Sequence, residues 1–390
     1  MARIEKIKAQ TILDSRGQWT LEAKIFSDTG LEAVAGVPQG KSRGKGEAVS
    51  REAEEAVSNV NDKINQALKD FSLDNQEGID NRLKELDGSE DKSNLGGNAI
   101  LAISLASARL MAKVDNKPLW LYLSQLTGSH PQAPKLLANL INGGLHAQSG
   151  LDFQEYILIP ETNNIKEAIE IILKVYNNLG QLLKTYPSGT AVGDEGGYAP
   201  SLDDNNYPFE LIKKALSRSE IKFSFGLDAA ADNIADLTEE ELFEAYSQMI
   251  DNFPLTYLED PFGEGDFSAW RRVFSEFSNK VDIVGDDLTV TNPKLLSKPE
   301  MKEMINGVII KPNQIGTLSE TLEAIKIAKQ NNWRIFVSHR SGETNDDFIA
   351  DLAFGVGADG FKLGAPARGE RISKYNRLLK INVEKDILNN

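Results

Sequence analysis

Six apolar runs in the second half of the chain each lead into one polar residue, at nearly regular spacing. The runs, among them FSFGLD, LTYLED and GVIIK, have the length and composition of buried strands. The polar residues are Asp228, Glu259, Asp286, Lys311, His339 and Lys362. Successive members lie 23 to 31 residues apart, and one strand with its helix and loops in a β/α barrel takes about 30 residues. The pattern therefore predicts an α/β barrel in which six polar side chains meet at one mouth.

Three consecutive members of this series are acids, Asp228, Glu259 and Asp286. A single acid at the end of a strand is more often a solvated loop residue or the N-cap of a helix. Three converging carboxylates, however, repel one another unless a cation lies between them. Ligand oxygens, without cysteine and with little histidine, favour Mg²⁺ or another hard cation over zinc. Asp260 and Asp287, which directly follow two of these acids, fit supporting or capping positions better than ligand positions.

Length and charge limit the classes of protein to which the chain can belong. At 390 residues it exceeds one barrel of about 250 residues, so an additional domain is expected. Hydrophobic residues make up 41%, which is enough for a sizeable core. The formal net charge of −15 argues against binding to nucleic acid or to an anionic membrane. A small anionic substrate remains compatible, because a metal ion and a few basic side chains reverse the field locally.

Cysteine content and hydropathy bear on where the protein is found. The chain has no cysteine, which excludes disulfides and thiolate chemistry. The first residues alternate apolar and polar side chains and lack the apolar segment of a signal peptide. No window approaches the run of about 18 apolar residues that is typical of a membrane helix. We therefore expect a soluble, cytoplasmic protein.

The chain divides into two predicted domains. Residues 3–37 contain three strand-like runs that predict a small sheet, and residues 99–114 are apolar on nearly all sides, as in a buried helix. The segment TGSHPQAP (127–134) has the composition of a linker. We expect an α+β domain over residues 1–126 and a β/α barrel over residues 134–390. The runs KLLANLI and FQEYILI would complete eight barrel strands.

A basic, glycine-rich segment lies between the predicted sheet and the next helix. Residues 38–46 (PQGKSRGKG) predict a mobile loop. The following residues, 47–68, place Val57, Val60 and Ile64 at helical spacing, which predicts a helix with one apolar face.

Three further residues are candidates for acid–base chemistry or binding. A lysine in the position of Lys311 is often only a surface residue, but at a metal-lined mouth its pKa is expected to fall toward the range of a general base. Glu195 and His146 lie in the glycine-rich segments GDEGGYAP and NGGLHAQSG, which allow close approach to a ligand. A lone loop Glu is usually solvated and a lone His usually structural, so these two are weaker candidates on their own.

The segment SHRSGET (338–344) predicts an anion site. His339, Arg340 and Ser341 follow a strand side by side. Arginine, serine and exposed backbone N–H groups together suit a phosphate or carboxylate group. Lys362 adds a positive charge at the same mouth.

Longer motifs run in a fixed order along almost the whole chain. They include LDSRG, GNAILAISLA, INGGLHA, QEY, VGDEGGYAP, LEDPF, GDDLTVTNP, VSHRSGET and KLGAPAR. In these motifs the sequence resembles the enolase family, the phosphopyruvate hydratases of glycolysis. The resemblance implies an enolase-type β/α barrel whose second strand is antiparallel, preceded by a smaller α+β domain.

The resemblance also implies an activity, a cofactor and partners. Enolases are Mg²⁺-dependent hydro-lyases that reversibly dehydrate 2-phosphoglycerate to phosphoenolpyruvate. A lysine removes the proton next to a metal-bound carboxylate, and metal plus lysine charge stabilises the resulting intermediate. One firm Mg²⁺ site, a small anionic substrate and a homo-oligomer such as a homodimer are therefore expected, with no nucleic-acid or membrane partner.

The matching motifs imply roles for individual residues. Asp228, Glu259 and Asp286 would hold the Mg²⁺ ion. Lys311 would remove the proton, and Glu195 would protonate the departing hydroxide with Glu155 beside it. Lys362 would bind the substrate carboxylate. The remaining residues of the implied pocket are Arg340, Ser341 and the catalytic His339 at the phosphate end, with His146 and Gln154.

The loop over residues 38–46 departs from the family pattern. Gln39 replaces a serine that helps to ligate a second, phosphate-bound Mg²⁺ in enolases, while Lys41 and Arg43 add positive charge. One interpretation is an ordinary enolase with sequence drift. Another is altered phosphate handling, with Lys41 or Arg43 binding substrate in place of part of the second metal's charge, or a related carboxylate substrate. A third is a non-catalytic enolase-like binding protein.

Overall fold

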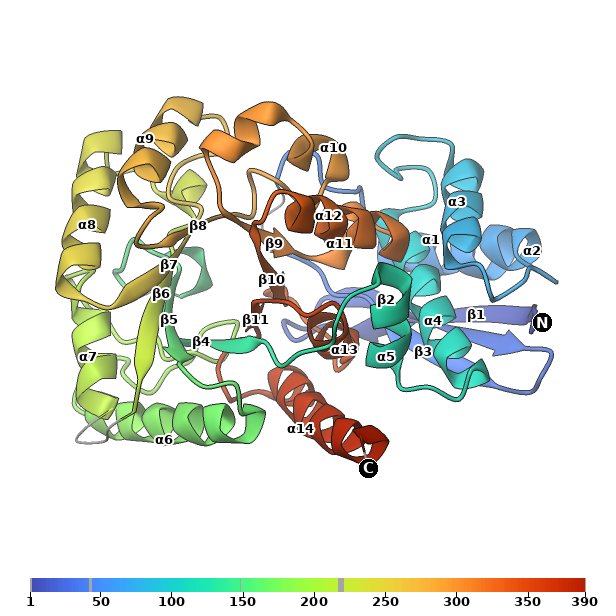
Figure 1. The fold of residues 1–390 in the computed structure, drawn as a ribbon, viewed down its shortest axis with the longest axis horizontal. Coiled ribbons are helices and arrows are strands. Elements are labelled where there is room, and N and C mark those ends of the chain that lie inside the picture. The colour runs from blue at the N-terminus through green and yellow to red at the C-terminus, as the bar shows by residue number, and fades with distance from the viewer. Residues whose placement is uncertain (1, 42–43, 148, 217–220, 390) are drawn as a thin grey trace.

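The computed structural model describes residues 2–41, 44–147, 149–216 and 221–389. An N-terminal sheet with its helices and a helix-wrapped barrel lie side by side (Figure 1). The C-terminal helix α14 (Gly369–Asn389) contacts α6 (Ile165–Leu183) and α13 (Phe348–Gly355) on the outside of the barrel.

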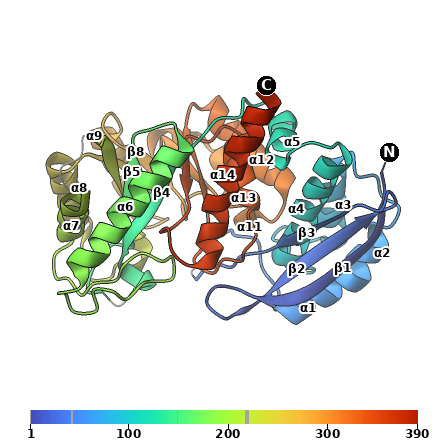
Figure 2. The same cartoon turned by 90° about the horizontal axis from the view of Figure 1, so that it is seen from below.

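The N-terminal sheet has three antiparallel strands in sequence order, as the alternating pattern predicts. Its strands are β1 (Ile4–Leu13), β2 (Trp19–Ser27) and β3 (Glu32–Gly36). Helices α1 and α4 pack against the sheet (Figure 2). The helices of this part are α1 (Ala53–Asn59), α2 (Asn65–Ala67), α3 (Gln76–Asp87), α4 (Gly97–Val114) and α5 (Leu119–Thr127).

The helix predicted over residues 47–68 begins later than expected. Regular helix starts at Ala53 and continues through one π-helical stretch, Val60–Ile64. The preceding residues are extended, because the Ala48 N–H donates to the Gln314 carbonyl oxygen, 2.7 Å away, and not to a preceding turn. Contacts with the barrel therefore override the helical preference of this segment.

Eight strands close into a barrel in the order of the sequence, and the predicted fold is confirmed. They are β4 (Lys135–Asn142), β5 (Glu155–Pro160), β6 (Phe223–Asp228), β7 (Leu255–Glu259), β8 (Asp282–Gly285), β9 (Gly307–Ile310), β10 (Arg334–Ser338) and β11 (Gly360–Lys362). The second barrel strand, β5, is antiparallel to both neighbours. The other strand pairs of the barrel are parallel.

Helices return the chain from one strand to the next. Beyond those named above they are α7 (Tyr207–Leu216), α8 (Glu239–Asn252), α9 (Phe267–Phe277), α10 (Pro293–Leu296), α11 (Pro312–Ile315) and α12 (Leu318–Gln330). Local sequence sets several starts: Thr238 and Glu241 form a reciprocal capping box at α8, and the Thr317 side chain accepts from the Glu320 N–H at α12.

The barrel interior is filled by side chains and is not an open channel. Tyr257, Val284, Ile309 and Phe336 belong to an inner cluster that is separate from the larger core between barrel and helices. Glycines face the largest of these side chains. A Cβ on Gly360 would lie 2.6 Å from the Phe336 ring, so only glycine fits there. The packed interior fixes the strand ends relative to one another.

Residues 128–134 form no helix or strand, which fits a linker. The domain boundaries at 1–126 and 134–390 stay a prediction. Among the described residues, α4 is long and apolar enough to cross a membrane, but 78% of that stretch is buried within the protein, as in the core helix of a globular fold.

Candidate active site

Alternation along the barrel strands directs the predicted polar residues into the barrel mouth. Side chains two positions apart on a strand point to the same face. Tyr257 and Ile309 belong to the inner cluster, so Glu259 and Lys311 point inward as well. Glu155, Asp228, Asp286 and Lys362 are placed by the same alternation. His339 is an exception: Phe336 belongs to the inner cluster, so the alternation directs Ser338 inward, and the histidine enters the site from the loop that follows.

One pocket at this mouth brings most of the sequence-predicted residues together. Its lining includes Lys41, His146, Gln154, Glu155, Glu195, Asp228, Asp286, Lys311, His339, Arg340, Ser341 and Lys362. Glu259 is buried beside the pocket and accepts from the Lys362 amine. Segments 300 residues apart in the sequence, the loops at Lys41 and Ser341, therefore meet at one site.

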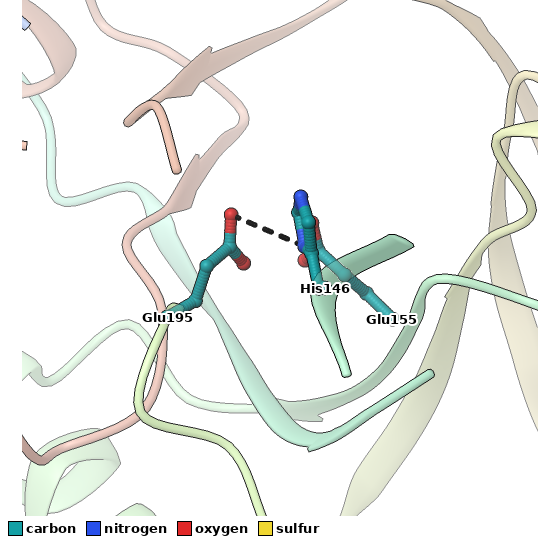
Figure 3. Close-up of side chains that lie close together, drawn as sticks. All are labelled: His146, Glu155 and Glu195. Carbon is teal, nitrogen blue, oxygen red and sulfur yellow. Dashed lines mark ion pairs between the residues drawn. The ribbon is translucent and has the colours of Figure 1, made fainter. Parts of the chain in front are cut away.

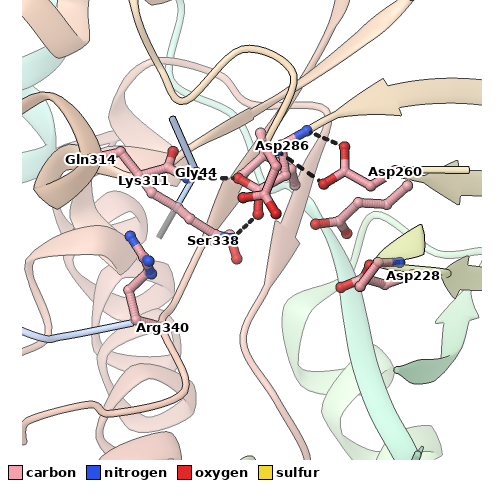
Figure 4. A network of polar contacts seen from close by, with 12 residues as sticks. Gly44, Asp228, Asp260, Asp286, Lys311, Gln314, Ser338 and Arg340 are labelled. Carbon is pink, nitrogen blue, oxygen red and sulfur yellow. Dashed lines mark hydrogen bonds and ion pairs between the residues drawn. The ribbon is translucent and has the colours of Figure 1, made fainter. Parts of the chain in front are cut away.

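The three acids predicted to bind metal form ion pairs with two different lysines. The Lys362 Nζ lies 2.7 Å from both Asp228 Oδ2 and Glu259 Oε2. The Lys311 amine donates to Asp286 (Figure 4). Glu259 Oε1 is buried and has no hydrogen-bond partner among the described residues. The three acids thus face one mouth with the two amines inserted among them.

A neighbouring acidic group lies closer together than the predicted three. Ligand atoms of Asp260, Asp286 and Asp287 lie within 4.8 Å of one another and could hold a cation. The Asp260 carboxylate, however, accepts the backbone N–H groups of Asp286 and Asp287 at 2.9 Å each. Burial, followed by the charge of Asp287, raises the pKa of Asp260 well above its usual range. Asp260 therefore supports the end of β8, as expected for a capping residue.

The environment of Lys311 corrects one sequence-based expectation. Burial is the largest single influence and lowers the pKa of this amine, but the carboxylates of Asp286 and Glu259 act against it, and the net shift is upward and not downward. Its backbone N–H donates to the Thr291 hydroxyl at 2.9 Å. Asp286 in turn accepts from Gln314 Nε2 at 2.9 Å. The sequence argument assumed nearby cations and did not include this direct ion pair.

On the opposite wall, His146 lies between two acids (Figure 3). Its Nδ1 is 3.7 Å from Glu195 Oε1 and 4.0 Å from Glu155 Oε1. Burial, then the charge of Glu195, raises the pKa of Glu155 well above its usual range. Burial lowers the pKa of His146. Glu155 can therefore hold a proton at neutral pH.

The loop after β10 places a histidine and an arginine in the pocket. His339 Nε2 lies 3.3 Å from Glu195 Oε2. Burial lowers the pKa of His339 to about 4, with Glu195 opposing and Arg371 adding to the shift. Arg340 is buried and pairs with Glu47 at 3.2 Å. His339 is therefore neutral at pH 7, while Arg340 supplies a fixed positive charge.

The N-terminal loop reaches the same pocket through Lys41. Its backbone N–H donates to Ser341 Oγ at 3.0 Å, and its Nζ lies 2.6 Å from the Leu145 carbonyl oxygen and 3.3 Å from Asp194 Oδ2. The Gln39 backbone pairs with Gly342. Arg43, singled out from the sequence, lies outside the described residues. Lys41 thus lines the pocket beside Ser341, with 43% of its side chain exposed.

Several residues that support the site escaped the sequence reasoning. They are Glu47, Asn139, Tyr257, Gln314 and Arg371. Tyr257, whose hydroxyl donates to Glu259, could have been found because it lies two residues earlier on the same strand. Glu47 and Arg371 contact residues far away in the sequence, and no local pattern identifies them.

Comparison with known proteins covers nearly the whole chain. Residues 4–123 match the family model "Enolase, N-terminal domain", and residues 132–388 match "Enolase, C-terminal TIM barrel domain". A protein named Enolase from Ehrlichia ruminantium (strain Welgevonden) is 42% identical over 405 residues, covering 97% of this chain and 96% of its own. Another Enolase, from Legionella pneumophila (strain Corby), is 40% identical over 407 residues, with the same coverage of both chains.

Proposed function

The chain belongs to the enolase family and dehydrates 2-phosphoglycerate to phosphoenolpyruvate, and we propose that the pocket at the barrel mouth carries out this reaction. The observation that supports the proposal is the convergence of a buried lysine, Lys311, and two buried acids, Glu155 and Glu195, on one pocket. A β-hydroxy acid loses water when one side removes a proton and the other protonates the leaving hydroxide. The pocket offers both functions on opposite walls.

We propose Asp228, Glu259 and Asp286 as the ligands of one Mg²⁺ ion. They fit a hard cation because their donors are all carboxylate oxygens. The buried and unpaired Glu259 Oε1 supports the assignment, since a buried carboxylate oxygen without a donor is costly unless a cation completes it. When bound, Mg²⁺ supplies charge that stabilises the negative intermediate.

Lys311 is proposed as the base that removes the proton next to the substrate carboxylate. A base must be neutral when it acts, and the Asp286 carboxylate now favours the charged amine. Competition of a cation for Asp286 would remove that influence and leave burial, which lowers the pKa of Lys311. Lys362 is proposed to bind the substrate carboxylate, because it is the second buried amine in the pocket.

Glu195 is proposed to protonate the departing hydroxide. The Asn139 amide donates to Glu195 Oε2 at 3.0 Å, and His339 lies on the same oxygen at 3.3 Å. Glu155 and His146 stand beside it, and the raised pKa of Glu155 supports its role as a proton reserve. Glu195, His339, Glu155 and His146 form the acid side of the pocket. Gln154 lies beside them and donates to Asp228 at 3.2 Å.

Arg340, Ser341 and Lys41 are proposed to bind the phosphate. Arginine and lysine donors suit phosphate oxygens, the arginine through two N–H groups and the lysine as a mobile point charge. The Lys41 backbone N–H donates to Ser341, and the Lys41 side chain lines the same pocket, in the loop where Gln39 stands in place of a metal-binding serine. We therefore propose that Lys41 supplies charge that a second Mg²⁺ would otherwise contribute.

A cytoplasmic homodimer is proposed from family membership. The exposed apolar residues Leu13 and Trp19 support it, because 55% and 63% of them remain exposed at one end of the N-terminal sheet. The segment LDSRGQWT at this end departs from the sequence that usually forms the subunit contact in the family. Light scattering after size-exclusion chromatography measures the subunit number directly, and a monomer would contradict this proposal.

The assay of 2-phosphoglycerate turnover across a Mg²⁺ titration tests the proposed function. We expect phosphoenolpyruvate to form only with the metal, and Lys311→Ala to stop its formation. Lys326→Ala, which removes an exposed lysine on α12, is the matched control. A folded wild-type protein that binds 2-phosphoglycerate without turnover would indicate a binding protein. Turnover only of acids without a phosphate group would indicate a different substrate.

A further inference from the structure

Arg371 on α14 connects two loops of the site, the loop after β10 and the loop that carries Asp194 and Glu195. Its side chain is fully buried. Nη1 donates to His339 Nδ1 at 2.7 Å and to the Arg340 carbonyl oxygen at 2.6 Å. Nη2 donates to the carbonyl oxygens of Ser341 at 2.7 Å and Asp194 at 3.2 Å. One side chain thus holds the histidine, the anion-binding loop and the loop of the proposed acid.

The contact with His339 decides which ring nitrogen carries the proton. A guanidinium group has donors only, so His339 Nδ1 must accept from it. A neutral imidazole that accepts at Nδ1 carries its hydrogen on Nε2. His339 Nε2 lies 3.3 Å from Glu195 Oε2. The ring nitrogen that carries the hydrogen is therefore the one beside the carboxylate proposed to protonate the leaving hydroxide, although it completes no hydrogen bond within the described residues.

We infer that Arg371 is a positioning residue for the dehydration: it fixes His339 as the Nε2–H tautomer, so that an N–H group and not a lone pair faces Glu195 where water leaves. The inference rests on the proposed roles of Glu195 and His339. Loss of the arginine would leave His339 Nδ1 without its donor and allow the other tautomer, whose Nε2 is a lone pair facing a carboxylate. Glu195 would then have a repulsive lone pair beside it in place of a favourable N–H group.

Packing keeps the histidine in this arrangement. Gly364 has a φ of +78°, and a Cβ there would lie 2.9 Å from His339 Cε1 and 3.0 Å from Arg371 Cδ. Only a hydrogen atom therefore fits between the ring, the arginine and the chain. The close contact limits how far the ring can turn away from Glu195.

A second arginine on α14, Arg377, provides a comparison, because its contacts indicate a mainly structural role. Arg377 pairs with the carboxylates of Asp351 and Glu384, each at 2.6 Å. Arg371 instead directs its donors at one imidazole and three carbonyl oxygens, with Glu370 3.6 Å from its Nε. Buried charges are usually matched by opposite charges. Because the nearest side-chain partner of Arg371 is a histidine of the pocket and not a carboxylate, we relate this arginine to the chemistry of the site.

Nitrogen-15 NMR of histidine-labelled protein measures the tautomer directly. The chain has three histidines, and His339→Gln identifies the signal of His339 by its loss. We expect wild-type His339 to be the Nε2–H tautomer, and Arg371→Met to show a mixture or the Nδ1–H form. A wild-type His339 in the Nδ1–H form overturns the inference, whatever happens in the variants.

Kinetics separate positioning from simple stability. Arg371→Met should lower kcat roughly 10–100-fold, as removal of a supporting hydrogen bond often does, while KM stays within about threefold. Exchange of the substrate proton that Lys311 removes should continue, and Arg371→Lys, which keeps one donor, should restore part of kcat. Arg377→Met should reduce thermal stability with kcat unchanged.

Equal kcat in Arg371→Met and Arg377→Met would overturn the inference, as would a loss confined to KM. If Arg371→Met fails to fold, wild type and Arg371→Lys decide the question. A wild-type protein with no turnover of 2-phosphoglycerate would instead refute the proposed function. The NMR result on the tautomer of His339 would still be valid, because that measurement does not depend on turnover.

Discussion

His339 makes the folded state sensitive to acid in a way that can be calculated. Burial lowers its pKa from the ordinary value of 6.5 to about 4, so the folded protein resists binding a proton that the unfolded chain accepts. A group with a lowered folded-state pKa contributes stability that is fully present above its unfolded pKa and lost as the pH falls toward its folded pKa. For His339 this window runs from about pH 6.5 to about pH 4.

The two pKa values set the magnitude. At pH 7 the histidine is mostly neutral in both the folded and the unfolded protein, so it changes the free energy of unfolding by almost nothing. At pH 5 the unfolded chain is protonated and the folded protein is not, which lowers the free energy of unfolding by about 2 kcal/mol relative to pH 7. Buried acids with raised pKa values, such as Glu155 and Asp260, act in the opposite direction. Only a comparison between wild type and variant therefore isolates the histidine.

Urea unfolding at pH 7, 6 and 5 provides the comparison. His339→Gln should lose about 2 kcal/mol less stability than wild type between pH 7 and pH 5, even if it is less stable overall. His130→Gln, at an exposed position, is the control and should follow wild type. Parallel curves for wild type and His339→Gln would refute the reasoning, because they would mean that the folded protein protonates this ring as easily as the unfolded chain does.

Three further expectations concern catalysis. Chelation should abolish activity and Mg²⁺ restore it, with Mn²⁺ as a possible substitute, since all three proposed ligands are carboxylates; full activity in excess chelator would rule out the metal site. Lys311→Ala should lose on the order of 10²–10⁴-fold in turnover, and Glu195→Gln should keep exchange of the substrate proton while stopping water loss; a Lys311→Ala enzyme close to wild type would refute the assignment of the base. Lys41→Ala should raise KM for the phosphorylated substrate, and Gln39→Ser should strengthen the second phase of a Mg²⁺ titration, because each variant changes the charge available to the phosphate. If the wild type binds two metals tightly and Lys41→Ala has no effect, the sequence of this loop is a neutral variation.

The barrel and its mouth could be predicted because they depend on short-range patterns. Apolar runs that lead into polar residues at regular intervals identify strands, and alternation within a strand predicts which side chains face inward, as for Glu259 two residues after Tyr257. Residues from loops, such as Glu195 and His146, were weak candidates until the family motifs were considered, since a loop position alone does not predict where a side chain points.

Pairings between distant segments could not be predicted. The late start of α1 follows from the contact of residue 48 with the barrel and from the ion pair of Glu47 with Arg340, 293 residues away. The upward shift in the pKa of Lys311 depends on its direct contact with Asp286. Both effects arise from tertiary contacts, which outweigh local preference and leave no periodic signal in the sequence.

The reversed direction of β5 has a consequence for how the acid wall is assembled. Because β4 and β5 run in opposite directions, the chain turns around at the mouth, and the single connection over residues 143–154 carries His146 and Gln154 directly into Glu155. In β5, Glu155 pairs with Asp228, the last residue of β6. Had the strand run the other way with the same sequence, its first residue would lie at the far end of the barrel, about 17 Å from the mouth for a strand of this length. A change of strand direction thus lets one uninterrupted stretch of chain supply three neighbouring groups.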